Sequence, residues 1–279
     1  MHADSVPRVI VDYHMHLRNG RGEIAHEAAA VEPFVETARA RGVDEIGFTE
    51  HVYYFRQTRP LWTVPYHVER CVYDIEEYVD AVVTAKERGL PVKLGLEVDY
   101  VPGREEETRT LLEPYPWDYL LGSIHWLDDF STDSEPRLID ELGVEGAWRR
   151  YFEALAGAAR SRLFDSLSHP DVIKIFDVRP QRPIVEELHD QFAAAVADAG
   201  IALEVSTAGL HKPVGELYPD PHLLAACRAR DVPVTLASDA HYPELVGRDF
   251  DRARELLGSA HYATITVFEQ REARQVPLG

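Results

Sequence analysis

Short apolar runs alternate with longer segments of helical spacing along the whole chain. The apolar runs predict β-strands near residues 9–11, 45–48, 92–98, 119–124, 163–167, 201–205 and 233–237, with a last strand-like segment at 264–268. Helical patterns lie near residues 32–41, 68–88, 144–159, 184–199, 222–230 and 249–257. Gly42, Gly89 and Gly200 follow three of these segments, where glycine commonly ends a helix. The pattern therefore predicts repeated strand–helix units.

This regular alternation predicts a parallel sheet, because a helix is the usual connection between parallel strands. Seven or eight such units in one domain favour a closed α/β barrel, and an open doubly wound sheet is the alternative. Dinucleotide-binding and P-loop folds are disfavoured. No Gly-x-Gly-x-x-Gly follows the first strand, and the chain contains no Gly-Lys-Ser/Thr.

The size and composition suit one large domain. The chain has 279 residues, a length that a single α/β barrel reaches, and 45% hydrophobic residues, enough for a full core. No apolar run approaches the roughly 18 residues that a membrane span needs. The first residues lack the features of a secretory signal, and Cys71 and Cys227 form neither a disulfide framework nor a Cys-x-x-Cys motif. These features predict a cytoplasmic protein.

The chain is strongly acidic, with 29 basic and 48 acidic residues and a net charge of −19. Nucleic acids and anionic membranes are bound by basic surfaces, so we expect neither as a partner. A small anionic substrate is compatible with this charge, because divalent cations make a pocket locally positive within an acidic protein. No feature of the sequence predicts a particular oligomeric state.

Residues of the types that bind metals follow most of the predicted strands. His14 and His16 come just after the first apolar run, and side chains two residues apart on a strand point to the same side. Asp239 and His241 repeat this spacing after the run at 233–237. The other strand ends carry His51, Glu97, His125 and His169. Because catalytic groups of parallel barrels lie at the carboxyl ends of the strands, we expect these eight side chains to converge.

Any one of these residues alone is typical of an ordinary hydrogen-bonded side chain, but eight together favour a metal cluster. They exceed the four to six ligands of one transition-metal ion and suit two or three ions. Glu97 can bridge two ions because a carboxylate has two oxygens. Imidazole and carboxylate ligands are accepted by Zn, Mn and Fe, so the ligand chemistry predicts divalent ions without selecting one.

The ordered motifs resemble those of the PHP (polymerase and histidinol phosphatase) superfamily. They are Asp12-x-His14-x-His16, Thr49-Glu50-His51, Gly95-x-Glu97, Gly122-Ser123-x-His125, Ser168-His169-Pro170-Asp171 and Ser238-Asp239-Ala240-His241. Residues 204–212 and 213–219 further resemble the monofunctional histidinol-phosphate phosphatases within it. The resemblance implies a single domain over residues 1–279, a distorted (β/α)7 TIM-like barrel and a trinuclear metal site. It also implies hydrolysis of L-histidinol phosphate, a late step of histidine biosynthesis.

The resemblance also implies how the ligands are shared. The implied sets are His14, His16, Glu97 and Asp239 for the first ion, Glu97, His125 and His169 for the second, and His51 and His241 for the third. Some relatives place another histidine or acid about six residues after the His-x-His pair, where this chain has Gly22. His26 or Glu50 is a candidate for the additional ligand, although an ordinary polar role near a helix is favoured for His26.

The implied chemistry is attack on phosphorus by a hydroxide that two cations share, opposite the leaving alkoxide. Glu97 and Asp239 are the predicted catalytic residues, and Asp239 or the third cation would assist the leaving group. Asp12 is a candidate for orienting a ligand imidazole, with an ordinary strand-end hydrogen bond as the alternative.

The substrate contacts are less specific in the sequence. The candidate phosphate contacts are Lys174, Lys212, Arg160 and Arg182, each with simple solvation as the alternative. Tyr53, Tyr54 and Trp126 are candidates for lining the substrate pocket, whereas core packing is favoured for Phe55.

Other functions remain open from the sequence. A PHP-family phosphoesterase for another small phosphate ester is the main alternative, because loops select the substrate while the metal site does the chemistry. A polymerase-associated exonuclease is disfavoured by the acidic charge and the absence of polymerase segments. A metal-dependent amidohydrolase commonly carries a carboxylated lysine on a mid-barrel strand, where this chain has Glu97 and His125. A metal-binding regulatory protein is the non-enzymatic alternative.

Overall fold

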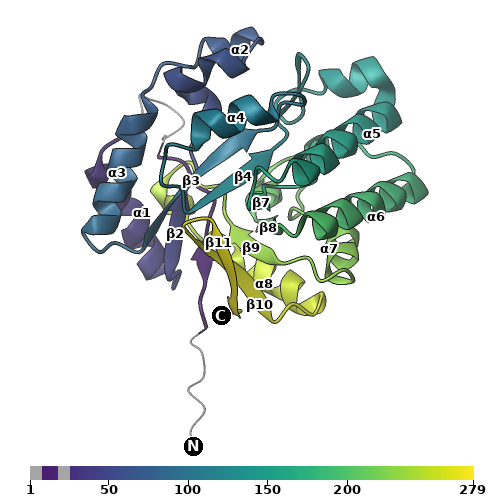
Figure 1. The fold of residues 1–279 in the computed structure, drawn as a ribbon. Coiled ribbons are helices and arrows are strands. Elements are labelled where there is room, and N and C mark those ends of the chain that lie inside the picture. Colours follow the sequence, from purple (N-terminus) through teal and green to yellow (C-terminus); the bar gives the residue numbers. More distant parts are fainter. Residues whose placement is uncertain (1–7, 18–25) are drawn as a thin grey trace, which may run out of the picture.

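Seven parallel strands form the central sheet within the residues that the structure, a computed structural model, describes, which are 8–17 and 26–279 (Figure 1). In their order across the sheet they are β1 (Val11–Asp12), β2 (Glu45–Phe48), β3 (Val92–Asp99), β4 (Tyr119–Ser123), β7 (Ser166–Leu167), β8 (Ala202–Ser206) and β9 (Val234–Ala237). Each pairs in parallel with its neighbour. They correspond to the seven apolar runs of the sequence.

The sheet closes into a barrel between its first and last strands. The Tyr13 N–H donates a hydrogen bond to the Leu236 carbonyl at 3.0 Å, and Met15 and Ala240 form a parallel bridge just beyond. These contacts join β1 and the residues after it to β9 and the residues after it. The barrel prediction is therefore confirmed, and the open-sheet alternative is wrong.

The last predicted strand is not an eighth strand of this barrel. It forms β10 (Thr264–Glu269), which pairs antiparallel with β11 (Glu272–Pro277). Because β9 and β1 already close on each other, the barrel offers no free edge to a further strand. The hairpin packs against the amino-terminal end of the barrel, where the Arg271 N–H donates to the Asp118 carbonyl just before β4. It therefore covers the end opposite the predicted ligands.

Helices cover the outer surface of the barrel (Figure 1). They are α1 (Ala28–Ala40), α3 (Ile75–Glu87), α4 (Glu105–Leu112), α5 (Arg137–Ser161), α6 (Arg182–Ala199), α7 (Pro221–Arg228) and α8 (Phe250–Ser259). Each buries apolar side chains on one side, as helices that pack on a sheet do. None of the helices in the described part of the chain combines the length and apolar character needed to cross a membrane.

Two helices differ from the sequence-based expectation. The pattern at 68–88 is divided between the short α2 (Pro65–Val68) and α3. Asp74 starts α3, because its carboxylate accepts a hydrogen bond from the Glu76 N–H and so caps a new helix. α5 begins seven residues earlier than expected, and Gly143, with φ of 69°, interrupts it where the predicted helix began.

The loops at the carboxyl ends of the strands carry most of the short elements. After β2 come η1 (Val52–Tyr54), η2 (Arg56–Leu61) and α2; after β4 come β5 (Trp126–Leu127) and β6 (Phe130–Ser131); η3 (Val172–Phe176), η4 (Ala208–His211) and η5 (Pro243–Leu245) follow β7, β8 and β9. They lie at the end of the barrel that carries the predicted ligands, where loops shape substrate pockets in barrel enzymes.

Gly47 in β2 leaves room for an aromatic side chain inside the barrel. A Cβ at this position would overlap the Tyr119 hydroxyl. Tyr119 is held in place, because its hydroxyl donates to the Tyr13 carbonyl at 2.7 Å and its ring stacks on Phe268 at 5.3 Å. Gly47→Ala is therefore expected to lower the free energy of unfolding by about 1–3 kcal/mol, measured by urea denaturation. Gly258→Ala in α8 is the control, since its Cβ would meet nothing within 4 Å; equal losses in both variants would contradict the argument.

Candidate metal centre

The eight predicted ligands converge at the carboxyl-terminal end of the barrel. They are His14 and His16 after β1, His51 after β2, Glu97 in β3, His125 after β4, His169 after β7, and Asp239 and His241 after β9. Their nitrogen and oxygen atoms form four overlapping groups, in each of which all ligand atoms lie within 4.8 Å of one another. Barrel closure thus brings together side chains from both halves of the chain.

Glu97 lies at the middle of this cluster. Its Oε1 lies 3.0 Å from His169 Nε2 and 3.4 Å from His125 Nε2. Its Oε2 lies 2.8 Å from His51 Nδ1 and 3.4 Å from His14 Nε2. The two oxygens face different pairs of imidazoles, which is the arrangement that a bridging carboxylate requires.

Asp239 joins the two histidines that follow β1. Its Oδ1 lies 3.7 Å from His14 Nε2 and 3.5 Å from His16 Nε2. The backbone holds this arrangement, because the Ala240 N–H donates to the His14 carbonyl at 3.2 Å and the His16 N–H donates to the Ala240 carbonyl at 2.8 Å. The hydrogen bonds that close the barrel therefore also position these three side chains.

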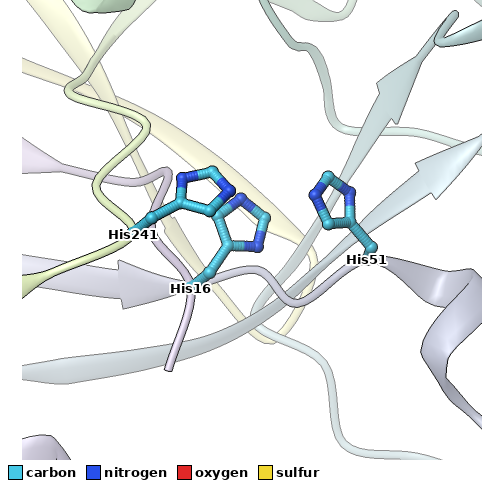
Figure 2. A group of neighbouring side chains, drawn as sticks. All are labelled: His16, His51 and His241. Carbon is cyan, nitrogen blue, oxygen red and sulfur yellow. The ribbon is translucent and has the colours of Figure 1, made fainter. Parts of the chain in front are cut away.

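A third group consists of imidazoles alone. His16 lies next to both His51 and His241, with ring centroids 4.4 Å and 4.3 Å away. Figure 2 shows His16 and His241 close together, with His51 facing them from the other side. The side chain of His241 is 36% exposed, so this group lies on the solvent side of the cluster.

The residues present fit a metal centre. Among the described residues, His14 Nε2 and both ring nitrogens of His16 are buried and have no hydrogen-bond partner. A buried polar atom without a partner costs roughly 1–3 kcal/mol, so a bound group that engages these atoms would stabilise the fold. Divalent cations engage imidazole nitrogens and carboxylate oxygens together, and this donor set suits Zn, Mn and Fe.

Two carboxylates that the sequence interpretation did not assign support the ligands from behind. Glu204 Oε2 lies 2.8 Å from His14 Nδ1, and its Oε1 accepts the His169 backbone N–H at 3.0 Å. Asp99 Oδ1 lies 3.0 Å from His125 Nδ1. Such partners fix the tautomer and orientation of a ligand imidazole. The signals were an acid inside a predicted apolar strand for Glu204 and, for Asp99, a position two residues after Glu97.

The close approach of these groups changes their pKa values. Although burial alone raises the pKa of Glu97, the imidazoles of His125, His14 and His51 hold it well below its usual range. Burial lowers the pKa of His14, but Glu204 and Glu97 together raise it well above its usual value. A cation that binds His14 must therefore displace a proton, and metal binding should be accompanied by proton release.

Asp12 contacts a loop rather than a ligand imidazole, so the prediction that it orients an imidazole is wrong. Its carboxylate accepts hydrogen bonds from the Ser238 N–H at 2.9 Å, the Ser238 hydroxyl at 2.6 Å and the Gly247 N–H at 2.8 Å. Burial raises the pKa of Asp12 to about 6. Asp12 therefore anchors the loop that presents Asp239.

Lys174 points into the protein. It is fully buried, and its ammonium donates to the Leu217 carbonyl at 2.7 Å and lies 2.9 Å from Asp171 and 3.4 Å from Glu216. These contacts tie the loop after β7 to the loop after β8. The ammonium is thus engaged internally, and the structure does not support the prediction that Lys174 contacts phosphate.

The remaining predicted phosphate contacts lie in two different places. Arg160 on α5 lines an outer cavity with Phe192, and Arg182 at the start of α6 pairs with Glu186 at 2.6 Å. Because α5 and α6 cover the outside of the barrel, the structure does not bring these arginines to the cluster (Figure 1). Lys212 is exposed just after η4, on the loop that leaves the carboxyl end of β8. It stays a candidate substrate contact.

The candidates for an additional ligand differ in their position relative to the cluster. Gly22 lies outside the described residues. The His26 ring lies 5.8 Å from that of Phe55 and belongs to none of the four groups of potential ligands. Glu50 is buried with Oε2 3.7 Å from His16 Nδ1, so it adjoins a ligand from behind. Phe55 is fully buried, which confirms its predicted core packing.

The chain is similar to known proteins over most of its length. The PHP domain family matches residues 12–208. A protein of Deinococcus radiodurans named "Probable histidinol-phosphatase" is 33% identical over 248 residues, covering 86% of this chain and 91% of that protein. The histidinol-phosphatase of Bacillus subtilis is 25% identical over 244 residues, covering 78% of this chain and 89% of that protein.

The fold is similar to that of a solved structure as well. A histidinol phosphate phosphatase from Lactococcus lactis, in complex with zinc, L-histidinol and phosphate, superposes with a TM-score of 0.74 at 21% identity, covering 96% of this chain and 100% of the other. This likeness supports the barrel architecture. The PHP domain match covers residues 12–208, and the relative from Deinococcus radiodurans is 33% identical over 86% of this chain. The chain therefore belongs to the PHP domain family.

Proposed function

We propose that this protein is a metal-dependent histidinol-phosphatase, which hydrolyses L-histidinol phosphate to L-histidinol and phosphate. The observation that carries the proposal is the convergence of six histidines and two carboxylates at the carboxyl end of a PHP barrel. The relatives reported above, named as histidinol-phosphatases, support the choice of substrate.

Two or three divalent cations are proposed to occupy the centre. The proposed ligand sets are His14, His16, Asp239 and Glu97 for one ion, His125, His169 and Glu97 for a second, and His51 and His241 for a third. Zinc, manganese or iron bound there would lower the pKa of a water molecule towards neutrality and neutralise the charge of the phosphate. Glu97 holds the first two sets together because its oxygens face them separately.

Asp239 is proposed to move the proton during hydrolysis. Burial alone raises the pKa of Asp239, but the imidazoles of His14 and His16 and that of His241 hold it well below its usual range. Its side chain is 18% exposed whereas that of Glu97 is fully buried, so Asp239 is the carboxylate nearer to solvent. Because its pKa is low, Asp239 is proposed to hold the proton of the attacking water only transiently, and as a strong acid it returns that proton readily to the alkoxide oxygen of histidinol.

Phosphate release from L-histidinol phosphate by the metal-loaded protein tests this function. We expect turnover that exceeds turnover of sugar and nucleotide monophosphates, disappears with a chelator and returns with added metal. Faster turnover of another monoester would favour the alternative of a PHP phosphoesterase with a different small substrate. No hydrolysis of any ester would favour a metal-binding protein without activity.

Lys212→Ala is expected to lower kcat/KM for histidinol phosphate about ten- to a hundredfold, mainly through KM, without changing the metal content. The exposed ammonium lies on the loop after β8 and can donate a charge-assisted hydrogen bond to the phosphate. Steady-state kinetics at saturating metal measures the effect. Arg182→Ala on the outer helix α6 is the matched control and should be unaffected; a Lys212→Ala variant equal to it would place Lys212 outside the site.

A further inference from the structure

A cluster of aromatic rings lies beside the metal centre. The Tyr53 ring stacks on the His51 ring, with ring centroids 4.9 Å apart. The Tyr53 ring also lies 5.0 Å from the ring of His67. His67 also lies within 4.9–5.5 Å of three further rings. We call this the His67 cluster, which consists of Tyr53, Trp62, Tyr66, His67 and Trp126.

The His67 cluster is built from the loops that surround the carboxyl end of the barrel. Tyr53 lies in η1 and His67 in α2, both after β2, whereas Trp126 lies in β5, after β4. Tyr53 and His67 are buried, and Tyr66 and Trp126 are partly exposed. The cluster therefore extends from the ligand candidate His51 towards the solvent.

His67 is an unusual member of an aromatic cluster because its polar atoms have no partner. It is 3% exposed, and among the described residues neither of its ring nitrogens has a hydrogen-bond partner. Trp62 differs, because its Nε1 donates to the Thr58 hydroxyl at 3.1 Å. Metal binding does not account for His67, which belongs to none of the four groups of potential ligands. A buried imidazole without partners costs stability, so a group that engages its nitrogens would stabilise the fold.

A carboxylate oxygen near His67 is also without a partner. Asp99 Oδ1 engages His125 Nδ1, but Asp99 Oδ2 is buried and makes no hydrogen bond within the described parts of the chain. The charge of Asp99 acts on His67. Burial lowers the pKa of His67, so its ring is neutral and offers one N–H and one acceptor nitrogen. Between the metal centre and the aromatic rings, the protein thus presents both donors and acceptors that remain unused.

We propose that the His67 cluster binds the imidazole ring of the substrate and that His67 determines specificity for it. This inference rests on the proposed function. A substrate imidazole is a flat aromatic ring with one donor and one acceptor, so it can stack on the aromatic side chains and hydrogen-bond to neutral His67. Asp99 Oδ2 offers an additional acceptor. The phosphate at the other end of the substrate would then lie at the metal centre, which adjoins the cluster through His51 and Tyr53.

Access to His67 depends on the two outer rings. His67 is buried, and the rings of Tyr66 and Trp126 lie 5.5 Å and 5.0 Å from its ring, so a ligand that engages its nitrogens requires these outer rings to shift. These two rings lie 4.9 Å apart, and both border solvent. Arg70 lies over the Tyr66 ring at 3.5 Å, whereas Trp126 has no such cation above it among the described residues, so Trp126 is the outer ring proposed to shift.

His67→Phe tests the inference, because it keeps an aromatic ring and removes both nitrogens. The measurement is kcat/KM for L-histidinol phosphate and for O-phosphoethanolamine, which has the same amine and phosphate ester but no imidazole. We expect the ratio of the two values to fall about tenfold or more, chiefly through KM for histidinol phosphate. His67→Gln, whose amide can still donate and accept, should recover part of the ratio. An unchanged ratio in both variants would overturn the inference.

The control is His189→Phe, which removes another fully buried imidazole from α6 on the outside of the barrel. It should leave the ratio unchanged, and an equal fall there would also overturn the inference. The wild-type protein separates this inference from the function on which it rests. Failure of the wild type to hydrolyse histidinol phosphate refutes the proposed function, whereas wild-type turnover with an unaffected ratio in the His67 variants refutes only the role of His67.

Discussion

Glu97→Gln is expected to lower kcat for histidinol phosphate by more than about a hundredfold while the fold is retained. Loss of a residue that merely supports a metal ligand costs about ten- to a hundredfold, and a bridging ligand should cost more. The two oxygens of Glu97 face separate pairs of imidazoles, at 2.8–3.4 Å. Glutamine has the same shape but no charge and only one acceptor oxygen, so it bridges two cations poorly.

Elemental analysis, circular dichroism and steady-state kinetics of the same preparation measure this effect. Glu204→Gln is the graded comparison, because Glu204 contacts His14 and the His169 backbone without being a predicted ligand. We expect that variant to lose about ten- to a hundredfold. Glu113→Gln, at an exposed position just after α4, should behave as the wild type. Full metal content with near-normal kcat in Glu97→Gln would remove Glu97 from the centre.

His14→Ala is expected to reduce the bound metal and to lower Tm by about 5–10 °C. A ligand that binds only the native state at a hundred times its Kd stabilises it by about 2.7 kcal/mol, and each kcal/mol is worth about 2–4 °C in a domain of this size. His14 is fully buried and is a proposed ligand of the first ion, so its loss should weaken the binding of that ion.

Thermal unfolding with and without a chelator separates metal loss from simple loss of packing. If metal binding explains the effect, the chelator should lower the wild-type Tm and close most of the gap to His14→Ala. His211→Ala is the control, because His211 is exposed, pairs with Asp249 at 2.6 Å and belongs to no ligand group. An unchanged Tm and metal content in His14→Ala would refute the role of the first strand in the centre.

The identity of the ligand candidates could be predicted because it depends on local features of the chain. His14 and His16 lie on one side of a strand end by backbone geometry alone, and so do Asp239 and His241. Parallel strands carry their carboxyl ends to the same face of a barrel, so the positions of His51, Glu97, His125 and His169 could also be inferred. The structure brings all eight together.

The partners of those ligands could not be predicted, because they are set by contacts between distant segments. Glu204 lies 190 residues from His14 along the chain, yet their side chains meet at 2.8 Å. Lys174 carries a charge suited to phosphate, but the fold places it against Asp171 and Leu217. The partner of Asp12 could not be predicted either, because Ser238 lies 226 residues away along the chain.

The sequence by itself determined the succession of strands and helices and the residues at the strand ends, because apolar periodicity and residue spacing act over short distances along the chain. Only the tertiary structure decided how the barrel closes, that the last strand forms a separate hairpin, and which polar atoms are left without partners. Those outcomes depend on which segments, distant along the chain, pair or pack with one another after folding. His67 illustrates the difference: in the sequence it is one histidine in a short helical segment, and only packing places it, unpaired, beside the metal centre.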